Sequence, residues 1–325
     1  MIYMTDKDNK SILSDKDILI LRKLLENGRQ SSASISKEID LGREIVNYRI
    51  KRLIKENLIV KFVPKINDKA INYKEYIILL KLNLDDEMSK ENFIKNNIGN
   101  KYLVWILKSN SGWDLIVRLY AQSIEEFKKK LEEILESYSE VLAKYYTIIS
   151  SDEIKEKEKE TILEKIFSES PTKKDFKIIK QGELLQLDNK DKEILHYLEQ
   201  DARVQYKEIS QKLDISSDTV KYRIDKMKSQ GIIKNFTPLI NYNKIGFIQY
   251  AAILKFNYLN KIEEENATNI IKESKCIIKA IKSLNSQEFF LTLVFEKENE
   301  INKFKELLDK KFKNKIENLE MFKIE

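Results

Sequence analysis

The first 65 residues show a helical period of apolar positions, followed by a short apolar run. Three segments place an apolar residue every three or four positions, which predicts three short amphipathic helices. Ser14 and Asp17 supply a start signal for the first helix, Ser34 is expected to cap the second, and Gly42 marks a tight turn before the third. The inward residues are expected to be Ile18, Leu21, Leu24, Leu25, Ile35, Ile39, Leu41, Val46, Ile50, Leu53 and Ile54.

The third helix is expected to run from about residue 43 to 57, and residues 58–63 read as a strand that Pro64 ends. Three short helices with a tight turn between the last two, followed by a strand pair, are typical of a winged helix-turn-helix domain.

The same pattern returns 174 residues later. Residues 13–67 lie over residues 187–241 without a gap, and the block Val46, Tyr48, Arg49, Ile50 returns as Val220, Tyr222, Arg223, Ile224. A repeat this long and constant in register indicates a duplication. We therefore expect one architecture present twice in one chain.

After residue 75 the period changes to that of strands alternating with helices. Strands are expected at 76–84, 102–108, 113–120 and 141–149, with helices at 89–97 and 124–138. The second copy repeats this order at 250–258, 267–272, 277–283, 289–295, 301–312 and 316–324. The order βαββαβ is that of a ferredoxin-like sandwich. The fold class is therefore predicted as α+β, with two copies of a winged helix-turn-helix followed by a βαββαβ domain.

These elements predict six segments: a tail at 1–12, winged helix-turn-helix domains at 13–70 and 187–244, sheet domains at 71–150 and 245–325, and a charged linker at 151–186. Opposite charges alternate at 153–160, which favours a solvated helix or a tether there.

The composition permits a polyanionic partner and argues against several classes. The 325 residues carry a net charge of +6 and 34% charged residues. A single cysteine, the absence of a long apolar run and the lack of a signal-peptide core together predict a cytoplasmic protein without membrane segments. One histidine and one cysteine cannot assemble a usual His/Cys zinc site, and no glycine is followed by lysine as in a P-loop. No catalytic residue, metal or cofactor is expected.

The third helix of each copy carries the candidate chemistry. From residue 43 to 65 there are seven basic residues (43, 49, 51, 52, 55, 61 and 65) and two acidic ones (44 and 56). Lysine and arginine neutralise phosphates, and arginine and asparagine bond base edges in the major groove. The predicted DNA-contacting residues are Arg43, Glu44, Asn47, Tyr48, Lys51, Arg52, Lys55 and Lys61 in the first copy and Ser217, Asp218, Lys221, Tyr222, Lys226, Lys228 and Lys234 in the second. Arg49 and Arg223 are instead expected to brace their domains.

Three motifs in each half match those of a known family: residues 13–19, 46–53 and 59–62 in the first, and 187–191, 220–224 and 231–234 in the second. Through these motifs each half resembles the leucine-responsive regulator (Lrp/AsnC) family of transcription factors. The resemblance implies a DNA-binding regulator whose sheet domains pair and sense a small molecule such as an amino acid. In the tandem chain it implies an intrachain pseudo-dimer, with further assembly left open.

The resemblance also points to an effector turn between two strands. The family's glycine-x-aromatic-aspartate turn is matched in part by Ser111, Gly112, Trp113 and Asp114. The second copy has Gln287 and Glu288 there and lacks the glycine. An ordinary polar hairpin turn is the alternative interpretation.

Because the two recognition faces differ, we expect a transcriptional regulator that reads two unequal half-sites. Two alternatives stay open. One is an enzyme similar to the siroheme decarboxylases, which share this superfold, although neither sheet domain contains a histidine. The other is a chromatin-architectural protein that binds DNA with little sequence preference.

Overall fold

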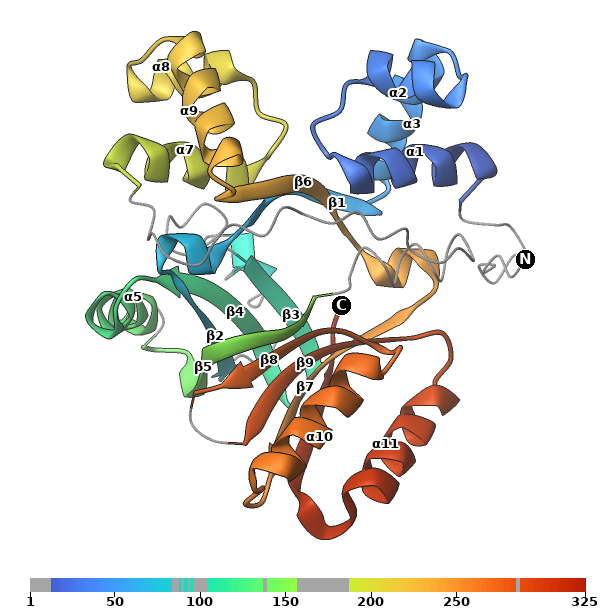
Figure 1. Cartoon of the computed structure of the whole chain (residues 1–325), viewed down its shortest axis with the longest axis vertical. Coiled ribbons are helices and arrows are strands. Elements are labelled where there is room, and N and C mark those ends of the chain that lie inside the picture. The colour runs from blue at the N-terminus through green and yellow to red at the C-terminus, as the bar shows by residue number, and fades with distance from the viewer. Residues whose placement is uncertain are drawn as a thin grey trace. The chain divides into compact units, whose positions relative to one another are not determined.

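The computed structural model describes residues 13–83, 88, 91–92, 94–95, 105–136, 139–156, 187–284 and 287–325. The chain divides into two compact units, here called the helical unit (Met1–Asn72 with Ile162–Ile245) and the sheet unit (Tyr73–Thr161 with Gly246–Glu325) (Figure 1). Each unit therefore combines one segment from each copy of the repeat.

The helical unit contains the two predicted sets of three helices. They are α1 (Asp15–Glu26), α2 (Ser32–Ile39), α3 (Arg43–Lys55), α7 (Asn189–Gln200), α8 (Tyr206–Leu213) and α9 (Ser217–Ser229). At the start of α1 the Ser14 hydroxyl accepts from the Asp17 amide, and the Asp17 carboxylate accepts from the Ser14 amide. Asp188 and Asp191 form the same capping box at α7. Each box satisfies two backbone amides that the helix itself leaves unpaired.

The turn before each third helix contains an aspartate with a positive φ angle. Asp40 and Asp214 both adopt the left-handed conformation, with φ of 51°, which aspartate tolerates because its short polar side chain can bond locally. Gly42 has φ of −58° and is the N-cap of α3. The side chain that caps α2 belongs to Ser31. The turn is therefore where the sequence predicted it, with Gly42 at its end, but the prediction that Ser34 caps the second helix was wrong.

The strand that follows each third helix pairs with the other copy. β1 (Ile59–Ile66) and β6 (Ile233–Ile240) form a two-stranded antiparallel sheet, here called the β1–β6 ribbon. The prediction of a strand ended by Pro64 was wrong, because Pro64 lies inside β1 opposite Phe236. A two-stranded sheet has only edge strands, and an edge strand accommodates a residue that lacks an amide proton.

The β1–β6 ribbon has a pseudo-two-fold axis through the pair Val63 and Thr237. These two residues are themselves equivalent positions of the repeat. Phe62 pairs with Pro238 and Pro64 with Phe236, so each contact has its mirror in the other copy. Such reciprocity defines an isologous interface, the kind that joins the subunits of a two-fold dimer. The two winged helix-turn-helix domains are therefore arranged as a pseudo-dimer within one chain.

Among its described residues, the sheet unit contains one antiparallel sheet of eight strands, with helices from both copies. Its elements are β2 (Lys74–Leu82), β3 (Trp105–Ser111), β4 (Trp113–Ala121), α5 (Ile124–Glu136), β5 (Leu142–Glu156), β7 (Ile248–Phe256), α10 (Lys261–Glu273), β8 (Ile277–Ser283), β9 (Glu288–Phe295), α11 (Asn299–Phe312) and β10 (Ile316–Lys323). The strand order is β10-β7-β9-β8-β5-β2-β4-β3. Each copy contributes four adjacent strands in the same internal order, which confirms the predicted ferredoxin-like arrangement. The predicted helix at 89–97 falls largely outside the described residues.

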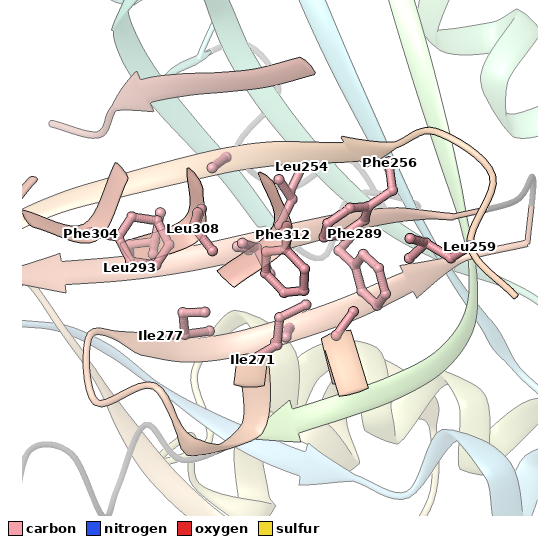
Figure 2. Packing of buried hydrophobic residues seen from close by; sticks show 14 of the residues in the cluster. Leu254, Phe256, Leu259, Ile271, Ile277, Phe289, Leu293, Phe304, Leu308 and Phe312 are labelled. Atoms are coloured by element: carbon pink, nitrogen blue, oxygen red, sulfur yellow. The ribbon is translucent and has the colours of Figure 1, made fainter. Parts of the chain in front are cut away.

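Buried hydrophobic clusters lie on both faces of the sheet. Residues of α10 and α11 pack with Phe256, Phe289 and Phe295 in one core (Figure 2), and Phe127 of α5 packs against Tyr76 in another. A third cluster joins the two copies, with Ile77, Leu79 and Ile116 from the first and Ile253, Phe290 and Phe322 from the second. Burial on both faces explains why strands such as β2 and β9 are apolar almost throughout.

The sheet continues into the segment that the alternating charges predicted as a helix or tether. β5 runs to Glu156, and Glu153 pairs with Ile281 while Lys155 pairs with Ala280 of β8. Lys155 is buried, and its ammonium bonds the Ser274 carbonyl. Residues 153–156 are therefore part of a strand, because the edge of β8 offers hydrogen-bond partners to their backbone. Residues 157–186 lie outside the described residues.

Candidate nucleic-acid interface

The recognition helices α3 and α9 turn polar faces away from the core. Val46, Ile50 and Leu53 of α3 are buried, whereas Tyr48 and the equivalent Tyr222 of α9 are each 67% exposed. Ile54 is 42% exposed, so its predicted inward position was wrong. The other candidates on these helices are exposed or half-buried: Arg43, Glu44, Asn47, Lys51, Arg52, Lys55, Ser217, Asp218, Lys221, Lys226 and Lys228.

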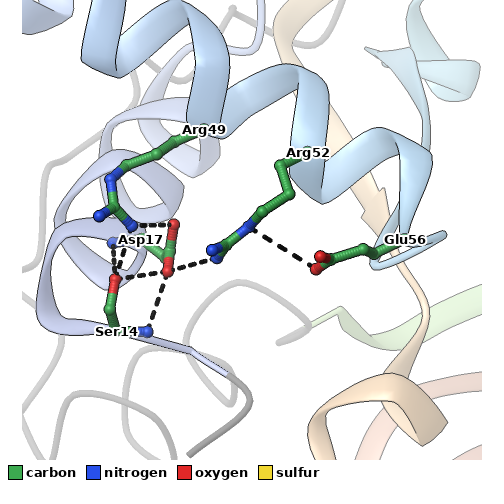
Figure 3. A network of polar contacts seen from close by, with 5 residues as sticks. All are labelled: Ser14, Asp17, Arg49, Arg52 and Glu56. Carbon is green, nitrogen blue, oxygen red and sulfur yellow. Dashed lines mark hydrogen bonds and ion pairs between the residues drawn. The ribbon is translucent and has the colours of Figure 1, made fainter.

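A buried carboxylate holds α3 against α1. The Asp17 side chain is fully buried, and its carboxylate oxygens form ion pairs with Arg49 Nη1 at 2.9 Å and Arg52 Nη2 at 2.7 Å (Figure 3). The Ser14 hydroxyl lies 2.5 Å from the same carboxylate. Burial raises the pKa of Asp17, but the hydrogen bonds from Ser14 and Arg49 and the charge of Arg52 outweigh it, so the pKa lies below its ordinary value. This group of residues, here called the Asp17 clamp, fixes the orientation of the recognition helix.

Arg52 therefore has a structural task besides any contact with DNA. Its guanidinium bonds Asp17 and lies 3.7 Å from the Glu56 carboxylate. Copy two has only one arginine in the equivalent clamp. Arg223 bonds Asp188 at 2.7 Å and Asp191 at 2.8 Å. The bracing role expected for Arg49 and Arg223 matches these contacts.

Lys61 is half-buried and bonded within the fold, whereas Lys228 is exposed, with 40% of its side chain accessible. The Lys61 ammonium, from β1 of the first copy, donates at 3.0 Å to the Glu199 carbonyl in the last turn of α7 of the second copy. Burial lowers the pKa of Lys61. Lys228 lies 3.3 Å from Asp225 and over the ring of Phe236. Lys234, at the start of β6, is exposed.

Two arginines outside the predicted set of functional residues join the two winged helix-turn-helix domains. Arg29 donates to the Val204 carbonyl at 3.0 Å and to the Ala202 carbonyl, while Arg203 donates to the Gly28 carbonyl at 2.7 Å and to the Gln30 carbonyl. Each guanidinium also stacks on a phenylalanine of the ribbon. Arg29 and Arg203 occupy equivalent positions 174 residues apart, and their identity in the two copies was the available signal.

The backbone repeats this reciprocity. The Gly28 amide donates to the Phe236 carbonyl at 2.7 Å, and the equivalent Ala202 amide donates to the Phe62 carbonyl at 2.8 Å. Reciprocal hydrogen bonds therefore join the two domains that carry the recognition helices.

The candidate effector turn lies between β3 and β4. Gly112 has φ of +74°, and a Cβ on it would lie 3.0 Å from Phe322. Trp113 is 9% exposed, and its indole donates to Glu320 at 3.3 Å. The buried Asp114 accepts from the Leu82 amide at 2.8 Å, and Ser111 accepts from the Lys323 amide at 3.1 Å. These polar groups of the turn thus form hydrogen bonds with other parts of the sheet unit.

Within the described part of the chain, no three histidine, cysteine, aspartate or glutamate side chains are grouped so as to hold a metal ion. No helix among the described residues is long and apolar enough to cross a membrane.

Two winged helix-turn-helix domains with exposed recognition helices define a nucleic-acid-binding class, and comparison with known proteins agrees. Residues 13–60 and 187–234 both match a family model described as winged helix-turn-helix DNA-binding. An HTH-type transcriptional regulator of Pyrococcus furiosus is 32% identical over 130 residues, which are 38% of this chain and 85% of that protein. A regulator of the same type from Pyrococcus abyssi is 30% identical over 148 residues, 45% of this chain and 97% of that protein.

A whole relative thus corresponds to less than half of this chain. The chain belongs to the HTH-type transcriptional regulators, with the winged helix-turn-helix domain present twice. The resemblance of each half to the Lrp/AsnC family rests on the sequence motifs described above. The crystal structure of the siroheme decarboxylase NirDL superposes with a TM-score of 0.57 at 11% identity, covering 95% of this chain and 91% of that one. At that identity the likeness concerns the fold alone.

Proposed function

We propose that the protein is a DNA-binding transcriptional regulator that reads two unequal half-sites. The observation that supports this most is the β1–β6 ribbon, which relates two recognition helices of different sequence by a pseudo-two-fold axis. A two-fold arrangement of recognition helices matches two inverted half-sites separated by whole helical turns. Because the two helices differ, the half-sites differ as well.

The proposed contacts are exposed or half-buried residues of the two recognition helices, together with Lys234 at the start of β6. In the first copy they are Arg43, Glu44, Asn47, Tyr48, Lys51 and Lys55, and in the second they are Ser217, Asp218, Lys221, Tyr222, Lys226, Lys228 and Lys234. Lys61 leaves this set because its ammonium group bonds the Glu199 carbonyl within the helical unit. Arg52 acts chiefly through the Asp17 clamp.

Selection of binding sequences by the full chain, at one fixed salt concentration, tests the proposal. The expected result is a bipartite site with two different half-sites. Tyr48→Ala and Tyr222→Ala form a matched pair, because the two tyrosines are equally exposed at equivalent positions. Each variant should relax the sequence preference of one half-site and leave the other unchanged. A symmetric consensus, or a change in both half-sites with either variant, would contradict the proposal.

Small-molecule control is the part of the proposal that rests on the family resemblance. An amino acid bound near residues 111–114 would have to compete with the hydrogen bonds that the turn already makes. Calorimetric titration of each common amino acid, followed by DNA binding with and without it, tests this part. A flat titration for all of them would remove it without affecting DNA recognition.

We propose that the protein is not an enzyme. The decarboxylase shares the fold, and a fold alone does not give an activity. His196, the chain's single histidine, lies in α7 of the helical unit, 3.0 Å from Gln200. No histidine is therefore present in the sheet unit's sequence. An absorbance shift when an iron-tetrapyrrole is added, together with loss of a carboxylate from it, would overturn this.

The architectural alternative makes a different prediction for DNA binding. A low-specificity binder would hold unrelated duplexes with comparable affinity and a steep dependence on salt. Competition between the selected site and a scrambled duplex, at several salt concentrations, separates the two. We expect the selected site to win at every salt concentration.

A further inference from the structure

The first recognition helix carries an exposed apolar residue near its start, Ile45. Ile45 is 44% exposed and stands at the third position of α3. It lies outside the buried stripe of Val46, Ile50 and Leu53. Single exposed apolar residues are common on protein surfaces, so exposure alone decides nothing. Two further observations bear on Ile45: its place in the first turn of α3, and the polar residue at the equivalent position of α9.

Copy two has a polar pair where copy one has an apolar pair. Ser216 caps α9, and its hydroxyl accepts from the Thr219 amide at 3.0 Å and lies 2.8 Å from the Thr219 hydroxyl. The equivalent residues in copy one are Gly42 and Ile45, and α3 has no side-chain cap. Isoleucine and threonine have similar helix propensities, and glycine in place of serine costs only tenths of a kcal/mol. Folding of α3 therefore gives no reason for the exposed isoleucine.

The Ile45 side chain lies at the start of the recognition helix. A Cβ placed on Gly42 would be 3.7 Å from the Ile45 Cδ1 atom, so the side chain covers the first turn. In helix-turn-helix proteins the first residues of the recognition helix contact the base edges. Tyr48, one turn further along and 67% exposed, continues the same face.

An aliphatic side chain has no hydrogen bond to offer a base. Its favourable partner in the major groove is the 5-methyl group of thymine. We infer that Ile45 is a specificity-determining residue that packs on a thymine methyl in the half-site read by α3. This inference rests on the proposed function and deepens it. Thr219 has its hydroxyl tied to Ser216, so the half-site read by α9 is selected on a different basis.

Replacing thymine by deoxyuridine removes only the methyl group and so tests the contact directly. Each thymine of the selected site is replaced singly, and the dissociation constant of the full chain is measured at fixed salt. One replacement, in the half-site that Tyr48→Ala perturbs, should weaken binding about three- to fivefold, the effect of losing one buried methyl group. In Ile45→Ala the same replacement should change affinity less than about 1.5-fold.

Ile54→Ala is the matched control, because Ile54 is 42% exposed on the same helix but near its other end. It should keep the full methyl dependence. A flat deoxyuridine scan with the wild-type chain, a half-site without thymine, or an undiminished methyl effect in Ile45→Ala would each overturn the inference while the proposed function stands. If selection yields no preferred sequence, the proposed function fails first and this inference fails with it.

Discussion

Asn in place of Asp17 should loosen the first winged helix-turn-helix domain more than the same change at Asp191 loosens the second. Asp17 is fully buried and meets two guanidinium groups, whereas the Asp191 side chain is 11% exposed and meets one. The substitution keeps the shape of the side chain and removes its charge. In the first copy, Arg49 and Arg52 would then face each other without the carboxylate between them.

The size of the effect follows from burial. Removing one partner of a fully buried ion pair costs about 3–5 kcal/mol. Arg49 and Arg52 are 20% and 30% exposed and can partly rehydrate, so we expect Asp17→Asn to lower the unfolding free energy by about 2–3 kcal/mol. Arg223 keeps the 55% exposed Asp188 as a partner. Asp191→Asn should therefore cost only about 1 kcal/mol.

Amide hydrogen exchange resolved by peptide is the appropriate assay, because the chain has two units and a single melting curve would mix them. Protection of α1 and α3 should fall about 30-fold or more in Asp17→Asn, since each 1.4 kcal/mol is about tenfold. Peptides from the sheet unit serve as the internal control and should not change. Equal losses in the two variants, or a loss below about 1 kcal/mol in Asp17→Asn, would refute this account of the Asp17 clamp.

Acid should release the same clamp. The pKa of Asp17 is lower in the folded protein than its ordinary value of 3.8. The unfolded chain therefore binds the proton more readily, and the clamp stabilises the fold fully above about pH 4. Its contribution should be lost as the pH falls through the folded pKa. In Asp17→Asn this acid-dependent part of the stability should be missing, which peptide-resolved hydrogen exchange at pH 3 and pH 6 would measure.

Three further substitutions test the rest of the fold. Arg203→Ala removes two hydrogen bonds between the domains and should lower protection in the β1–β6 ribbon by about 1–3 kcal/mol, as measured by hydrogen exchange. Gly112→Ala places a Cβ at φ of +74° and 3.0 Å from Phe322, so it should destabilise the sheet unit by about 1–3 kcal/mol in tryptophan-monitored urea unfolding. Lys61→Met should leave the salt dependence of DNA binding unchanged, whereas a slope reduced by about one would return Lys61 to the DNA-contacting set.

The spacing of apolar residues along the chain was sufficient to predict the helices and most of the strands. The stripes that contain Leu21 and Ile50 have the helical period, and the residues in them are buried as expected. Duplication strengthened each prediction, since every element was read twice. The order of strands and helices within each copy then followed from the alternation of the two periods.

Which strands pair, and which distant side chains form ion pairs or hydrogen bonds, could not be predicted from the local sequence. The alternation in residues 59–66 predicts a strand but not whether its neighbour is local or in the other copy. The charged stretch at 153–156 gave no sign of the free edge of β8 that makes it a strand. Arg52 and Lys61 looked like surface cations because their partners, Asp17 and Glu199, are distant in sequence.

The β1–β6 ribbon also bears on how the protein responds to dilution. In a regulator assembled from two subunits, such pairing weakens as the protein becomes scarce, because association depends on concentration. Here both strands belong to one polypeptide, and a tether keeps the effective concentration of each for the other on the order of millimolar. The pairing of the two recognition helices is therefore independent of copy number. Occupancy of a site by this chain should rise with the first power of its concentration, where a dissociating dimer would give the square.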